Sequence, residues 1–179
     1  MDEGSNDEFP SSKVSNNYLG DDYMFGHFGF SYIGVIYLMM LFIPNTMWMK
    51  NQPLGYSPQG ENPVLVIFER IGQVAVTCIA VIFSDFNIRI NSWWSLWFAA
   101  SLVFMIFYEM YWLRYFKSSK GLKDFYSSFL GIPVAGATLP VIGFFLLGVY
   151  GKNLWMLIAI SILGIGHIGI HLNHRKLLS

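Results

Sequence analysis

The sequence has few charged residues and almost no cysteine. Only 12% of its 179 residues are Asp, Glu, Lys or Arg, and 54% are hydrophobic, whereas a globular domain has roughly a quarter charged residues. The one cysteine, Cys78, lies in an apolar run, which excludes an intramolecular disulfide and a cysteine metal cluster. The N-terminus also lacks the positive region of a cleavable signal peptide, so the first apolar stretch is expected to be retained. The shortage of charge predicts a protein that lies in lipid.

The charges that are present are distributed unevenly. Within the first 27 residues only Lys13 is basic, whereas six residues are acidic: Asp2, Glu3, Asp7, Glu8, Asp21 and Asp22. Residues 1–24 combine this acidity with Ser and Asn and contain too few apolar residues to form a core. We predict that they form a disordered acidic tail.

We predict that residues 25–179 form a single all-α domain, an integral membrane bundle of about five transmembrane helices. About 20 apolar residues suffice to cross a bilayer, and 25–49 contains no formally charged residue. Asn62 is suited to cap a helix that has Pro63 at its first position. Pro133 and Pro140 predict that the fourth helix is bent or broken. The predicted helices cover 25–49, 63–84, 92–113, 125–150 and 154–174.

The basic residues predict the orientation of these helices. With five spans, one side of the membrane receives three basic residues, Lys13, Arg89 and Lys152. The other side receives seven: Lys50, Arg114, Lys117, Lys120, Lys123, Arg175 and Lys176. Because basic loops stay on the cytoplasmic side, we predict an external N-terminus and a cytoplasmic C-terminus, in the plasma membrane.

Polar residues of different helices fall at a similar depth in this arrangement. Glu69, Glu109 and His167 lie about 7–12 Å from the predicted cytoplasmic helix ends at about 1.5 Å per residue. Arg70, Gln73 and Asn45, which is near the end of the first predicted helix, join them, and this predicts a cytoplasm-facing polar pocket. A charge inside a membrane costs on the order of 3 kcal/mol and needs a partner, so we expect Arg70 to pair with Glu109 and Glu69 to pair with a histidine. The alternatives are a purely structural ion pair that fixes helix packing, or an Arg70 side chain that extends back to the membrane interface.

The last predicted helix also offers a candidate metal site. His167, His171 and His174 share one face, but His167 and His174 are about 10 Å apart along the axis and cannot bind one ion. His167 with His171, completed by Glu69 or Glu109, would suit zinc or iron. In the alternative interpretation, His171 and His174 are interfacial residues stabilised at a helix C-terminus.

These patterns admit three functions and do not decide whether the protein is an enzyme. The favoured one is an accessory or protective membrane protein that acts through another membrane protein. The second is binding or transport of a cation or small polar solute in the polar pocket, and the third is a histidine–carboxylate metalloenzyme. The expected partners are the lipid bilayer and either a homo-oligomer or another membrane protein. No pattern supports nucleic-acid binding.

Overall fold

The computed structural model describes residues 25–89 and 93–178, which form an all-helical bundle. Four of its helices are long and apolar enough to cross a membrane: α2 (Tyr32–Met49), α3 (Pro63–Ile82), α4 (Ser95–Lys117) and α7 (Leu154–Lys176). The apolar helix α6 (Ala135–Tyr150) is shorter, and two short elements, η1 (Ser84–Phe86) and α5 (Leu122–Phe125), lie in connections. The predicted membrane helical bundle is confirmed; its predicted acidic tail, 1–24, lies outside the described residues.

Side-chain caps fix where the long helices begin. The Asn62 side chain accepts a hydrogen bond from the N–H of Val64, with Pro63 at the first helical position, as predicted. Asn153 and Ser31 cap α7 and α2 in the same way. These side-chain oxygens satisfy backbone N–H groups that have no partner within the helix. The predicted start of the second helix and the predicted span 154–174 are therefore confirmed to within two residues.

The first predicted helix, 25–49, begins seven residues too early. Gly26 has a φ of +79°, and the backbone of 27–31 runs beside that of 81–84. There the Gly29 N–H donates to Ile82 O at 2.8 Å and the Ser84 N–H donates to His27 O at 3.0 Å. An apolar segment without a charge looks helical by composition, but here its backbone hydrogen bonds go to another chain segment.

The fourth predicted helix, 125–150, is broken, and its first third is not a continuous helix. Residues 126–134 form turns with positive φ at Leu130, Gly131 and Val134. Pro133 disfavours a helical conformation at Ile132, which instead exchanges hydrogen bonds with Phe129. The remaining α6 has 16 residues, or about 24 Å at 1.5 Å per residue, less than the roughly 30 Å of a bilayer core.

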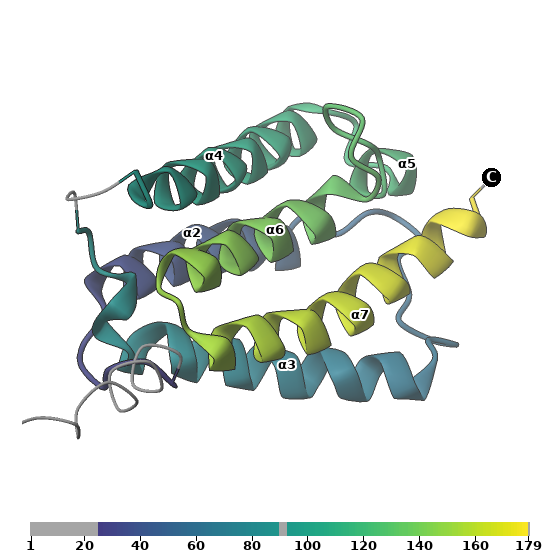
Figure 1. The fold of residues 1–179 in the computed structure, drawn as a ribbon. Coiled ribbons are helices and arrows are strands. Elements are labelled where there is room, and N and C mark those ends of the chain that lie inside the picture. Colours follow the sequence, from purple (N-terminus) through teal and green to yellow (C-terminus); the bar gives the residue numbers. More distant parts are fainter. Residues whose placement is uncertain (1–24, 90–92, 179) are drawn as a thin grey trace, which may run out of the picture.

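Four of the five main helices pack as two antiparallel pairs (Figure 1). Helix α3 lies along α7, and α4 lies along α6; contact between α6 and α7 joins the pairs, and the fifth helix, α2, lies beside α3 and α4. Glycines permit the closest approach: a β-carbon on Gly72 would lie 2.5 Å from Leu163 Cα, and one on Gly166 would lie 2.5 Å from Leu65 O. Small residues let membrane helices approach in this way.

Connections meet at both ends of the bundle. At one end, which we call the basic end, residues 50–62, 118–134 and the last turn of α7 come together. Tyr115 Oη donates to Asn51 O at 2.9 Å, and Arg175 Nη1 donates to Ser128 Oγ at 3.1 Å. The described basic residues predicted to be cytoplasmic therefore share one end of the protein.

Candidate functional site

A carboxylate–histidine pair joins α3 to α7 inside the bundle. Nδ1 of His167 donates to Oε1 of Glu69 at 2.5 Å, and the side chains are 25% and 15% exposed. Gly166 and Gly72 hold the two helix backbones close enough for this contact. Because Nδ1 faces the carboxylate, Nε2 is the ring nitrogen that remains for another partner. The expected pairing of Glu69 with a histidine is present.

A second pair of the same chemistry lies nearer the basic end. Nε2 of His174 donates to Oε1 of Glu61 at 2.9 Å. The His174 ring stacks on Tyr126 at 5.4 Å between centroids and 9° between planes. Glu61 directly precedes the helix cap Asn62, so the pair also fixes the end of α7 to the start of α3.

His171 lies between the two pairs on α7. Its ring centroid is 4.6 Å from that of His167, and it packs against Phe125 and Tyr126 at 5.4 and 5.5 Å. Three imidazoles thus follow one another along α7 from the bundle interior to the basic end. Aromatic rings pack against His171 and His174, whereas His167 lies 25% exposed beside the cavities.

A polar cavity of about 220 Å³ opens beside these histidines. Tyr56 and Trp48, which contact each other edge to face at 5.0 Å, belong to its wall at the basic end. The burial of Tyr56, together with the negative charges of Glu61 and Glu69, raises the pKa of its phenol. The polar residues that line this cavity are Asn45, Tyr56, Glu61, Glu69, Arg70, Gln73, His167 and His171.

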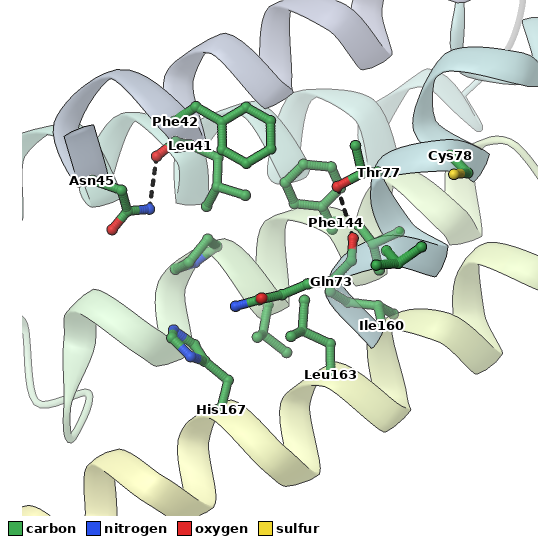
Figure 2. Close-up of a pocket in the computed structure, with 14 residues that line it drawn as sticks. Leu41, Phe42, Asn45, Gln73, Thr77, Cys78, Phe144, Ile160, Leu163 and His167 are labelled. Atoms are coloured by element: carbon green, nitrogen blue, oxygen red, sulfur yellow. Dashed lines mark hydrogen bonds between the residues drawn. The ribbon is translucent and has the colours of Figure 1, made fainter. Parts of the chain in front are cut away.

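A larger apolar cavity adjoins the polar one deeper in the bundle. It has a volume of about 500 Å³ and lies between α2, α3, α6 and α7. Both cavities are lined by Asn45, Gln73 and His167. Figure 2 shows the Gln73 side chain extending into the space between Asn45 and His167. The remaining wall is mainly apolar and includes Leu41, Phe42, Val74, Phe144, Ile160 and Leu163.

Backbone and side-chain hydrogen bonds hold the residues shared by the two cavities. Asn45 Nδ2 donates to Leu41 O at 2.8 Å, one turn earlier in α2, and to Tyr108 Oη at 3.1 Å on α4 (Figure 2 shows the first). Thr77 Oγ1 donates to Gln73 O at 2.7 Å. These contacts engage only Nδ2 of Asn45, so its Oδ1, the Gln73 amide and the His167 ring are the polar groups at the junction of the two cavities.

The predicted pairing of Arg70 with Glu109 is wrong. Arg70 lies on the exposed side of α3 and lines the polar cavity, but within residues 25–89 and 93–178 it forms no ion pair with Glu109. Glu109 lines neither cavity, and its Oε1 is buried without a hydrogen-bond partner in the described part of the chain. The two residues have a similar depth but belong to helices on opposite sides of the bundle (Figure 1).

The predicted metal ligands do not gather into a set. In the part of the chain that the structure describes, no group of three or more His, Cys, Asp or Glu side chains is arranged to hold a metal ion. His167 and His171 are neighbours, but the Glu69 carboxylate is hydrogen-bonded to the His167 ring. At the end of α7, the negative charge that faces His174 comes from Glu61. The position of His174 at a helix C-terminus did not predict this carboxylate.

Several residues of the site were not predicted. Tyr56 and Glu61 lie between the predicted helices 25–49 and 63–84, Trp48 lies at the end of the first of these, and Tyr126 lies at the start of the predicted helix 125–150. The available signal was positional: residues 50–62 and the last turn of α7 fall at the same end of a five-helix bundle, so a carboxylate in one can reach a histidine in the other.

A separate polar cluster closes the opposite end of the bundle. Asp85 is 4% exposed and accepts hydrogen bonds from the backbone N–H of His27 at 2.5 Å and from its Nδ1 at 2.8 Å. Arg89 lies 3.4 Å from the same carboxylate. These contacts anchor the segment before α2 to the turn after α3, which is a structural role.

Comparison of the chain with models of protein families, with curated proteins and with solved structures found no match. Its function therefore has to be argued from its own residues.

Proposed function

We propose that this membrane protein binds a small amphipathic molecule in its two adjoining cavities. The observation that carries the proposal is that an apolar space of about 500 Å³ and a polar space of about 220 Å³ share Asn45, Gln73 and His167. Small-molecule sites typically occupy about 300–1,000 Å³, with mostly apolar walls and a few placed polar groups. A ligand with one polar end and an apolar body matches both parts.

The polar end of the ligand would lie at Glu69, Gln73 and His167. The Glu69–His167 contact fixes the ring so that Nε2 is directed away from the carboxylate. The Gln73 amide supplies a donor and an acceptor at the same junction. These groups suit a hydroxyl, amide, amine or acid head better than a bare metal ion, because among the residues that the structure describes no three-ligand set is assembled around them.

The apolar body would enter from the side, through the bilayer. Phe42 on α2 and Val74 on α3 both line the apolar cavity and are 48% and 66% exposed. In a membrane this outer surface faces lipid or a partner helix rather than water. If the basic end faces the cytoplasm, the head of the ligand would be nearer the cytoplasmic leaflet.

The test uses three probes that share an oleyl chain and differ in the head: oleic acid, oleylamine and monoolein. Binding to the purified full-length protein in detergent is measured by native mass spectrometry. We expect Val74→Trp, which fills the side opening, to weaken binding of the preferred probe about tenfold or more. Ile71→Trp is the matched control, because Ile71 is 54% exposed on the same helix and lines neither cavity.

Three results would oppose the proposal. They are no binding of any probe, equal loss in both tryptophan variants, and unchanged binding in Val74→Trp. The first would favour the accessory role predicted from the sequence, in which the partner is another membrane protein or a second copy of the chain. Glu69→Gln tests the head: its effect on oleylamine should differ from its effect on oleic acid, because the negative charge attracts one and repels the other.

A further inference from the structure

Two arginines from different helices converge on one pair of serines at the basic end. Arg114, in the last turns of α4, donates from Nη1 to Ser128 O at 3.1 Å and from Nη2 to Ser127 Oγ. Arg175, near the end of α7, donates from Nη1 to Ser128 Oγ at 3.1 Å. The two arginines come from different helices and meet at two neighbouring serines in the 126–134 turn.

The acceptors in this cluster are neutral. Within the described part of the chain, neither guanidinium forms an ion pair with a carboxylate. Asp124 lies in the same segment, but its carboxylate accepts from Ser119 Oγ at 2.7 Å and from the Gly121 N–H at 3.1 Å. A guanidinium has five N–H donors, so both arginines keep donors for an anion.

A cavity adjoins the cluster. It has a volume of about 200 Å³ and is lined by Lys123, Tyr126, Ser127, Arg175 and Leu178. Of the two arginines only Arg175 lines this cavity, and Lys123 brings a second positive charge to its wall. Among residues 25–89 and 93–178, the cavity has no lining residue in common with either of the two cavities described above.

Exposed apolar side chains flank the cluster along the chain. Leu113 precedes Arg114 and is 59% exposed; Leu130 is 64% exposed and Leu177 is 84% exposed. Leucines this exposed beside arginines are suited to the boundary between hydrocarbon and headgroups, where basic residues meet lipid phosphates. A soluble phosphate site would not need them.

We propose that Arg114, Arg175, Lys123 and the Ser128 hydroxyl bind the phosphate of an anionic phospholipid at the basic end of the bundle. Arginine binds phosphate oxygens in a bidentate geometry, and the Ser128 hydroxyl donates to the same oxygens. The Ser127 hydroxyl donates to Asp124 O at 2.7 Å and only positions Arg114. The acyl chains of the lipid lie against Leu130 and Leu177. The site is independent of the amphipathic-ligand proposal, because it uses different residues and a different cavity.

The experiment measures thermal stability and bound lipid for the full chain in nanodiscs. One set of discs contains phosphatidylcholine only, and the other contains phosphatidylcholine with phosphatidic acid. We expect phosphatidic acid to raise the melting temperature of the wild type by several degrees and to be retained in native mass spectra. The double variant Arg114→Gln/Arg175→Gln should lose most of the shift and at least tenfold of the retained lipid. The matched control, Lys50→Gln/Lys117→Gln, removes two positive charges from the same end and should keep both.

Further arms separate the sources of phosphate and guard against misfolding. Inorganic phosphate added to phosphatidylcholine discs should not reproduce the shift. Because Arg114 also packs over Phe129 at 5.1 Å, Arg175→Gln alone is the second variant, and it should lose at least threefold of the retained lipid. Equal loss in the lysine control would show diffuse surface attraction instead of a site, and a full effect of inorganic phosphate would replace the lipid by a soluble anion. If the Arg175→Gln variant retained as much lipid as the wild type, the proposal would also be overturned.

Discussion

Gly72 is the position where the packing of α3 on α7 can be tested most directly. A β-carbon placed there would lie 2.5 Å from both N and Cα of Leu163 and 2.6 Å from its Cβ. These are mainly backbone atoms of a packed helix, so no side-chain rotation relieves the clash. Ordinary contact needs about 3.5–4.0 Å, and Gly72→Ala therefore requires the two helices to separate by about 1 Å.

Overpacking of this kind typically costs about 1–3 kcal/mol, and we expect Gly72→Ala to lower the free energy of unfolding by that amount. Reversible unfolding in mixed detergent micelles, followed by tryptophan fluorescence, measures it. The control is Gly121→Ala, where φ is −79° and the nearest atom to an added β-carbon is 3.7 Å away. If Gly72→Ala is as stable as the control, the close approach of α3 and α7 is refuted, and with it the helix contact on which the Glu69–His167 pair depends.

Two further outcomes follow from the polar contacts. A double-mutant cycle of Glu69→Gln and His167→Gln should give a coupling energy of about 0.5–2 kcal/mol, as for interhelical hydrogen bonds in membranes; strict additivity would mean that the side chains do not interact. Burial and the charges of Glu61 and Glu69 raise the pKa of Tyr56 above its ordinary value of 10.0. Its phenol therefore stays protonated in the folded protein at a pH where the unfolded chain has lost that proton, so the free energy of unfolding should fall as pH rises above about 10. Tyr56→Phe should have a shallower decline there, and an identical decline in both proteins would count against the burial of the phenol.

The helices could be predicted where local chemistry decides them. Asn62 followed by Pro63 marks the start of α3 because a side-chain cap and a proline act within a single turn. The prediction failed at residues 25–31, where long-range backbone pairing replaces an apolar helix. At 126–134 the break that the prolines predicted is present beside Pro133, and only its extent was not predicted.

The sequence predicted how deep the site residues lie along their helices, but not which neighbouring helix each of them faces. Glu69, Gln73 and His167 meet because α3 and α7 are neighbours, whereas Glu109 has a similar depth on α4 and lines neither cavity. Residue counting along a helix gives depth, since the rise per residue is constant. It does not give which helices are adjacent.

The sequence by itself determined that this chain is a bundle of apolar helices with most of its basic residues at one end. Those properties follow from composition and from the fixed geometry of a helix. Only the tertiary structure decided that α3 packs on α7 through glycine, that Glu69 pairs with His167 rather than His171, and that a polar and an apolar cavity share one wall. These depend on which helix faces meet, and that is set by side-chain shapes packing across the whole bundle.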